Sequence, residues 1–227
     1  MPPDLNIAKA APRGASGAFV LARLLHGAVA LAALAGIGLE VGAAVTGGPG
    51  IAPTQTERFV RLFSYFTIDS NLLIACVSLL LAFRPAHDGP LFRVLRLTAL
   101  LCIAVTGVVF HTVLTGLREL TPSGQLANFL LHTAAPGLAV LGWLLAGPRP
   151  RTDRGTIARA VLLPLAWIVY TFVRGAFVDW YPYPFMDVGK LGFARAALNS
   201  GLVALVFIVM AFGLRLLEKK LPAAPAG

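Results

Sequence analysis

Long apolar stretches separated by short polar segments dominate the pattern of this chain. A membrane-spanning helix needs about 20 mainly apolar residues. Six stretches meet this length, namely Phe19–Val45, Phe59–Phe83, Val94–Gly116, Leu126–Ala146, Ile157–Val178 and Phe193–Leu216. The segments between them are rich in glycine, proline and other turn formers. The pattern therefore predicts an all-α integral membrane protein, a bundle of six transmembrane helices.

The two ends of the chain differ from this pattern. The first apolar stretch is too long for a cleaved secretory signal and is followed by further spans, so we interpret it as the first helix. We predict a disordered N-terminal tail over residues 1–17, one transmembrane domain over residues 18–216, and a C-terminal tail over residues 217–227.

The basic residues indicate how the bundle is oriented, because lysine and arginine accumulate in cytoplasmic segments. Thirteen of the 19 lysines and arginines fall on the side of the two termini. They are Lys9, Arg13, Arg23, Arg84, Arg93, Arg96, Arg149, Arg151, Arg154, Arg159, Arg215, Lys219 and Lys220. The others are Arg58, Arg61, Arg118, Arg174, Lys190 and Arg195. We predict a multi-pass protein of the inner (cytoplasmic) membrane with both termini cytoplasmic.

Composition supports this interpretation. The chain is 57% hydrophobic and only 13% charged, whereas soluble domains carry about twice that share of charged residues. Its net charge of +9 lies in short segments between apolar stretches, which indicates membrane orientation and not nucleic-acid binding. No phosphate-cradling glycine loop is evident, so we expect no cofactor. Cys76 and Cys102 lie inside apolar stretches and are interpreted as small buried residues.

Several polar residues fall at one predicted depth in the outer half of the bundle. At ~1.5 Å per residue, Thr67 lies about 12 Å and His132 about 9 Å from the outer ends of their helices. The same layer includes Glu40, Asp69, Asn71, His111, Asn128, Arg174 and Asp179, whereas His26 lies in the inner half. Ionisable groups facing lipid cost on the order of 2.5–3.5 kcal/mol each. We therefore expect them to face a shared, wet cavity that opens to the outer leaflet.

Each of these residues also has an ordinary structural interpretation. Threonines in membrane helices usually bond their own backbone, and a histidine can simply link two helices. Asp69 and Arg174 could form an ion pair, and an interfacial aromatic belt could account for Trp180, Tyr181 and Tyr183. Pro136 cannot donate to the carbonyl of His132, so we expect a kink beside that histidine.

Three segments appear in order along the chain: FSYFTIDSN at 63–71, NFLLHTAAP at 128–136 and WYPYPFMDV at 180–188. Together with the number of helices, they resemble the bacterial Pr6Pr family of membrane proteins. They are also similar to the eukaryotic androgen-induced and androgen-dependent TFPI-regulating protein family, whose members hydrolyse fatty acid esters of hydroxy fatty acids. The resemblance covers roughly residues 18–216. It implies a threonine nucleophile at Thr67 and a partner histidine at His132.

The chemistry implied is acyl transfer from a lipid ester to Thr67, with membrane lipids as surroundings and the ester as the partner. A threonine hydroxyl needs a base to accept its proton, and histidine is suited to this at neutral pH. Asp69, Asn128 or a backbone carbonyl freed by Pro136 could orient the imidazole. The candidates for stabilising the oxyanion are Asn71, His111, Arg174 and Tyr183.

Two alternatives stay open. In a metal-dependent membrane hydrolase, His111 and His132 with Asp69, Asp179 or Glu40 would hold zinc, although the chain lacks a His-x-x-x-His or Cys-x-x-Cys spacing. In a non-enzymatic lipid-binding, ligand-binding or transport protein, the polar layer would bind a ligand, since intramembrane ionisable groups also mark transport paths.

Overall fold

The computed structural model describes residues 13–47, 52–117, 119–147, 149 and 152–221. Within these residues the chain is helical and contains no β-strand. Six helices, some of them interrupted, are long and apolar enough to cross a membrane. The predicted all-α bundle of six spans is therefore confirmed, while its orientation in the membrane stays a prediction.

The structure gives each span its bounds, and four of the six predicted spans contain more than one helical segment. The elements are α1 (Arg13–Val45), α2 (Gln55–Leu62), α3 (Phe66–Phe83), α4 (Pro90–Val109), the π-helical η1 (Phe110–Leu114), α5 (Pro122–Phe129), the π-helical η2 (Leu130–Ala134), α6 (Ala135–Leu145), α7 (Arg154–Ala160), α8 (Leu162–Val178), the 3₁₀ turn η3 (Pro184–Met186), α9 (Val188–Leu191) and α10 (Phe193–Glu218).

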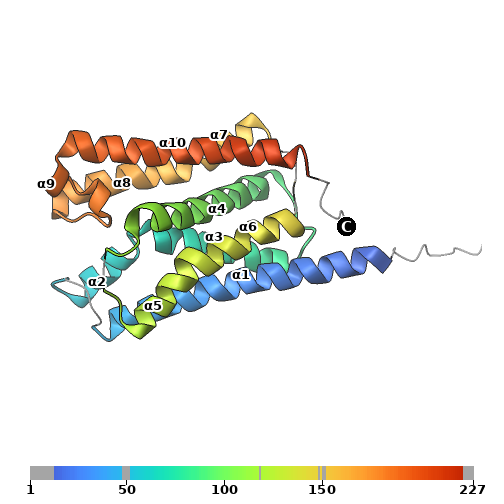
Figure 1. Cartoon of the computed structure of the whole chain (residues 1–227), viewed down its shortest axis with the longest axis horizontal. Coiled ribbons are helices and arrows are strands. Elements are labelled where there is room, and N and C mark those ends of the chain that lie inside the picture. The colour runs from blue at the N-terminus through green and yellow to red at the C-terminus, as the bar shows by residue number, and fades with distance from the viewer. Residues whose placement is uncertain (1–12, 48–51, 118, 148, 150–151, 222–227) are drawn as a thin grey trace, which may run out of the picture.

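The spans run up and down the bundle, so the beginning of α1 and the end of α10 lie at the same end (Figure 1). We call this the terminal end. The opposite end carries α2, the beginning of α5 and the α9 segment, and we call it the site end. In Figure 1, α8 and α10 lie along one side of the bundle and α1 on the other, with α3 and α4 between them.

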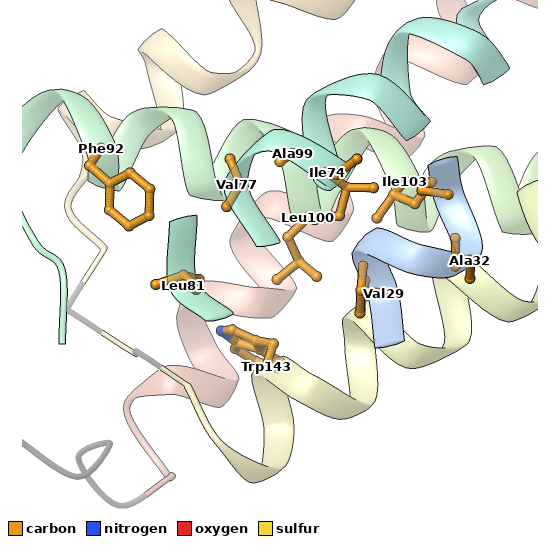
Figure 2. Packing of buried hydrophobic residues seen from close by; sticks show 14 residues of the cluster. Val29, Ala32, Ile74, Val77, Leu81, Phe92, Ala99, Leu100, Ile103 and Trp143 are labelled. Atoms are coloured by element: carbon orange, nitrogen blue, oxygen red, sulfur yellow. The ribbon is translucent and has the colours of Figure 1, made fainter. Parts of the chain in front are cut away.

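One apolar cluster joins α1, α3, α4 and α6. It includes Val29 on α1, Ile74 on α3, Ile103 on α4 and Trp143 on α6, all buried (Figure 2). Alanines on α1 and α6 take part in the same cluster, and small residues let helix backbones approach closely where lipid supplies no hydrophobic driving force. This cluster holds α3 against α6, the helix that continues from η2.

α4 is the central helix of the bundle. Its opposite face joins a second cluster, in which Leu101 and Val105 pack with Phe66 of α3, Ile157 of α7 and Phe207 of α10. Eleven consecutive positions, 97–107, are buried, as expected for a helix covered by protein on all sides. α4 thus connects the α1–α3–α6 group to the α8–α10 pair.

The second span differs from its prediction. An unbroken helix was expected over 59–83, but the structure divides this region into α2 and α3. At the break, Ser64 Oγ donates to the Val60 carbonyl, and the Ser64 carbonyl accepts from Trp167 Nε1 at 3.3 Å. Thr67 is therefore the second residue of α3, and the assumption of eight continuous helical residues from Phe59 to Thr67 is wrong.

Other boundaries also moved. α1 begins at Arg13, inside the predicted tail 1–17, and α10 extends to Glu218. The fifth span is interrupted at Val161 because Pro164 has no N–H for the carbonyl of Ala160, which accepts from Thr98 Oγ1 instead. Lys9, Arg118 and Arg151, together with residues 1–12 and 222–227 of the predicted tails, lie outside the described residues.

Candidate active site

Thr67, His132 and Tyr183 meet near the beginning of α3. Thr67 Oγ1 lies 3.2 Å from His132 Nε2 and 3.1 Å from the Tyr183 hydroxyl. The main-chain N–H of Thr67 also donates to the Tyr183 hydroxyl at 3.1 Å. Thr67 is buried, and the three side chains come from α3, η2 and the loop before η3. The threonine hydroxyl therefore has a base on one side and a phenol on the other.

The hydrogen-bond partners assign the protons. His132 Nδ1 lies 3.1 Å from the main-chain oxygen of Asn128, which only accepts, so Nδ1 carries the hydrogen in this bond. In the neutral imidazole Nε2 then has a free lone pair, which accepts from Thr67 Oγ1. Because Tyr183 accepts from the Thr67 N–H, its own hydrogen is available to Thr67 Oγ1. This is the arrangement that a general base requires.

The Tyr183 hydroxyl stays protonated at neutral pH. Desolvation of its hydroxyl beside Thr67 raises the pKa of Tyr183 above its ordinary value. The ring is held edge-on by Tyr65 at 5.7 Å and stacks on Phe185 at 5.4 Å between ring centroids. Tyr183 is therefore a fixed donor beside the Thr67 hydroxyl.

The position of His132 follows from the π-helical segment η2. There the N–H of Ala135 donates five residues back, to Leu130. The next N–H in that pattern would serve Leu131, but it belongs to Pro136 and is missing. The Leu131 carbonyl accepts from Asn71 Nδ2 at 3.1 Å instead. The sequence pointed to the carbonyl of His132 as the one that Pro136 leaves without a donor, whereas in the π-helical segment it is the carbonyl of Leu131, which binds a neighbouring helix.

Asn71 connects the two reacting side chains through their backbones. Its amide donates to the carbonyls of Thr67, at 2.8 Å, and Leu131, so both hydrogens are committed. The side chain is fully buried, and Ser70 Oγ also donates to the Thr67 carbonyl at 3.1 Å. Asn71 therefore positions Thr67 relative to His132 and has no free hydrogen for an oxyanion.

Two residues of the third span hold η2 from the other side. Phe110 stacks on the His132 ring, with centroids 4.2 Å apart and planes inclined by 25°. Gly107 lies so close to η2 that a Cβ there would come within 3.3 Å of the His132 carbonyl and 3.0 Å of Pro136. The glycine allows this approach, and the phenyl ring limits rotation of the imidazole.

A cavity of about 40 Å³ begins beside the reacting groups. Thr67, His132 and Tyr183 line it, and the rest of its wall is almost entirely apolar, with contributions from α4, α8 and α10. The predicted wet cavity shared by the whole polar layer is therefore not what the structure shows. Three of the predicted site residues face an apolar pocket.

The other candidates lie elsewhere. His111 is exposed and bonds Thr133 Oγ1 at 3.1 Å, while the side chains of Asp69 and Asn128 are half-buried and form no hydrogen bond with a described residue. Asp179 is exposed and ends α8 in a left-handed conformation, with φ of 49°. The group that bonds His132 Nδ1 is the main-chain oxygen of Asn128; Asn128 was among the candidates, but neither its side chain, nor Asp69, nor a carbonyl freed by Pro136 takes this role.

Arg174 belongs to a separate charged group at the site end. Its guanidinium bonds Glu57 Oε1 at 3.0 Å, and Glu57 also accepts from Arg61 at 2.8 Å. Both guanidinium groups lie 5.1 Å from the Trp180 ring centroid. Hydrogen bonding to Arg61 first, and then to Arg174, holds the pKa of Glu57 below its ordinary value. This group anchors α2 to α8, and the predicted pairing of Arg174 with Asp69 does not form.

The donor set considered for zinc does not gather in the described part of the chain. No three His, Cys, Asp or Glu side chains there lie close enough to hold a metal ion. His111 and His132 are separated by Phe110, which contacts both rings. Glu40 is on α1, half-buried. His26, set apart by the sequence, lines a different cavity and bonds Gly147.

Sequence reasoning missed Phe110, Gly107, Asn71 as a link between backbones, and Glu57. For Glu57, its spacing of four residues from Arg61 on a strongly amphipathic segment was an available signal. The contacts of Phe110 and Gly107 depend on how η2 is rotated, and no pattern in the sequence indicates that rotation.

Comparisons of this chain with protein-family models, with curated proteins and with solved structures found no match. The resemblance to the Pr6Pr family therefore stays a prediction, and the argument for a function rests on the geometry around Thr67.

Proposed function

We propose that this protein is an intramembrane hydrolase of lipid esters that forms an acyl-enzyme on Thr67. The observation that carries the proposal is the three-membered contact: a buried threonine hydroxyl between an imidazole nitrogen at 3.2 Å and a phenol at 3.1 Å. The Pr6Pr-like segments support the same assignment of Thr67 and His132. The substrate class, fatty acid esters of hydroxy fatty acids or similar esters, comes from that resemblance.

In the first half of the reaction, Thr67 Oγ1 attacks the ester carbonyl while His132 Nε2 accepts its proton. The carbonyl oxygen becomes an oxyanion, which the Tyr183 hydroxyl can reach from its place beside Oγ1. The oxyanion then collapses, the bond from the carbonyl carbon to the alcohol oxygen breaks, and His132 returns the proton to that oxygen. The alcohol leaves, and the acyl group stays on Thr67.

In the second half, water attacks the acyl carbon and His132 accepts a proton from it. The bond to Thr67 Oγ1 breaks, the threonine regains its proton from His132, and the free acid leaves. The first turn of α3 assists both halves because Thr67 sits at the positive end of its helix dipole, which stabilises negative charge on nearby oxygens.

Orientation and membrane belong to the proposal as well. If the basic terminal end faces the cytoplasm, the site lies towards the outer leaflet of the cytoplasmic membrane. A lipid ester would then reach Thr67 without leaving the bilayer.

The test is ester hydrolysis by the purified protein in detergent, with a fatty acid ester of a hydroxy fatty acid and a chromogenic medium-chain ester as substrates. We expect Thr67→Ala and His132→Ala each to lower kcat by about 10²- to 10⁴-fold, the range of nucleophile and base effects. A fluorophosphonate should label the wild type on Thr67 and fail to label Thr67→Ala.

Matched variants control for folding. Thr98→Ala removes another buried threonine hydroxyl, which donates only to backbone carbonyls. His26→Ala removes a buried histidine that lines a different cavity. Both should keep their activity. Full activity in Thr67→Ala would refute the acyl-enzyme, and loss in all four variants would mean that the truncations damage the fold.

A further inference from the structure

The cavity beside Thr67 is lined by residues of α3, α4, η1, η2, α8 and α10 and of the segment around η3. On the third span its lining runs from Val105 on α4 to Leu114 in η1, nine residues and roughly 13 Å along the helix. Leu114 and Phe185 line it at the site end, and Pro164 and Phe207 line it towards the terminal end. Thr67 and His132 lie on the wall between these ends.

Aromatic rings close the cavity on the side away from the site end. Phe66 packs edge-on against Trp167 at 5.1 Å and against Phe207 at 5.7 Å between ring centroids. Phe207 is only 3% exposed and comes from α10, fourteen residues after that helix begins at the site end. Its ring therefore occupies the space into which a longer occupant of the cavity would extend.

We propose that this cavity is the binding site for the acyl chain of the substrate, and that Phe207 limits the length of chain accepted. The inference rests on the proposed function. An almost wholly apolar wall that begins at the nucleophile suits an alkyl chain whose carbonyl carbon is at Thr67. About 40 Å³ holds only a few atoms, so short acyl groups fit this arrangement best.

The chemistry favours the acyl chain over the alcohol as occupant. The acyl group remains bonded to Thr67 through both halves of the reaction, so it can occupy an enclosed site throughout. The alcohol must leave and be replaced by water, which needs the more open side. That side is where His111 and Thr133 are exposed.

Two series of esters separate these assignments: one varies the acyl chain from acetyl to palmitoyl with a fixed alcohol, and the other varies the alcohol with a fixed acyl group. We expect Phe207→Ala to raise kcat/KM for octanoyl relative to butyryl esters by about tenfold, close to what two further buried methylene groups contribute. Val203→Phe, which fills the cavity from the same helix, should shift the preference to shorter chains.

Phe212→Ala is the matched control, because Phe212 is exposed on the same helix and does not line the cavity. It should keep the wild-type order of acyl chains. Unchanged acyl preference in both Phe207→Ala and Val203→Phe, or a shift confined to the alcohol series, would overturn the proposal.

A binding measurement distinguishes this proposal from the proposed function. Trp167 lines the cavity, so a short-chain fatty acid brominated near its methyl end should quench tryptophan fluorescence saturably in the wild type. Quenching should fall in Val203→Phe and in Trp167→Phe. Saturable quenching without hydrolysis of any ester would support the acyl-chain binding site and contradict the proposed hydrolase function. Hydrolysis with quenching that persists unchanged in Trp167→Phe would place the chain elsewhere.

Discussion

His132 donates from Nδ1 to the main-chain oxygen of Asn128, one turn earlier in its own span, at 3.1 Å. A backbone carbonyl thus takes the place that a carboxylate occupies in many hydrolytic sites. It fixes the tautomer and the ring orientation without adding a charge. In a membrane helix this matters, because an additional buried carboxylate would be costly.

Removing the Asn128 side chain should therefore have little effect. We expect Asn128→Ala to hydrolyse esters within about twofold of the wild type, since the carbonyl that orients His132 remains and the side chain forms no hydrogen bond with a described residue. Steady-state kinetics on the chromogenic ester would check this. A loss comparable to that of His132→Ala would show that the amide, and not the carbonyl, orients the ring.

Tyr183 should contribute to the rate and not only to packing. Tyr183→Phe keeps the ring contacts with Tyr65 and Phe185 but removes the donor beside Thr67 Oγ1. We expect kcat to fall by about 10²-fold, typical for loss of one oxyanion donor, with little change in KM.

Tyr181→Phe is the control for this variant, because it makes the same chemical change in the same loop at a hydroxyl that forms no hydrogen bond with a described residue. Its kinetics should match the wild type. If Tyr183→Phe retained the wild-type kcat, the oxyanion donor would have to be another group.

Particular residues show how much of the fold and of the candidate site the sequence predicts. The six spans follow from apolar length alone. Thr67 and His132 were selected by motif and by counting helical residues from the outer ends of their spans. For Thr67 the counted residues do not form one helix, because hydrogen bonds of Ser64 to Val60 and Trp167 accompany a break in the predicted second span. Such a break depends on a partner about a hundred residues away, which no local pattern contains.

Tyr183 illustrates the opposite limit. The sequence offered it both as an oxyanion donor and as part of an aromatic belt, and only the fold places its hydroxyl against Thr67. The neighbouring Trp180 has no such contact and stacks with Arg61 and Arg174. Which member of an aromatic cluster reaches a site is decided by the path of the loop.

The close contact at Gly107 should be sensitive to a single methyl group. In Gly107→Ala the added Cβ would lie 3.0 Å from Pro136 and 3.3 Å from the His132 carbonyl, so α4 and η2 must separate. We expect a loss of about 1–3 kcal/mol in stability from overpacking and a lower kcat, because His132 moves with its backbone.

Thermal unfolding in detergent and ester kinetics would measure these two effects. Gly137→Ala is the matched control, since a Cβ at this helical position meets nothing within 4 Å. It should be neutral or slightly stabilising, because alanine favours helix over glycine. Equal behaviour of the two variants would mean that α4 and η2 are not in tight contact.

Glu57 should make stability depend on pH. Its pKa is lowered in the folded state by Arg61 and Arg174, so its contribution is present above the unfolded value near 4.5 and is lost as pH falls through the lower folded value. We expect Glu57→Gln to unfold at a lower temperature than the wild type at neutral pH. The difference should shrink below about pH 4.5.

Thermal unfolding of both proteins across that range provides the measurement, and comparing them cancels the titration of other carboxyl groups. A difference that stays constant from neutral to acidic pH would mean that the carboxylate charge does not hold α2 against α8.

The basic terminal end should face the cytoplasm. Described residues at that end include Arg84, Arg93, Arg149 and Arg154. They lie in or beside the segments that connect the spans, where lysine and arginine set orientation under the positive-inside rule. In a background of Cys76→Ser and Cys102→Ser, we would place single cysteines at two exposed positions: Ser123→Cys in the first turn of α5 at the site end, and Ala86→Cys in the loop before α4 at the terminal end. A membrane-impermeant maleimide should label Ser123→Cys in intact cells and Ala86→Cys only after lysis. The reverse labelling pattern would mean that the bundle has the opposite orientation, with Thr67 in the half of the membrane that faces the cytoplasm.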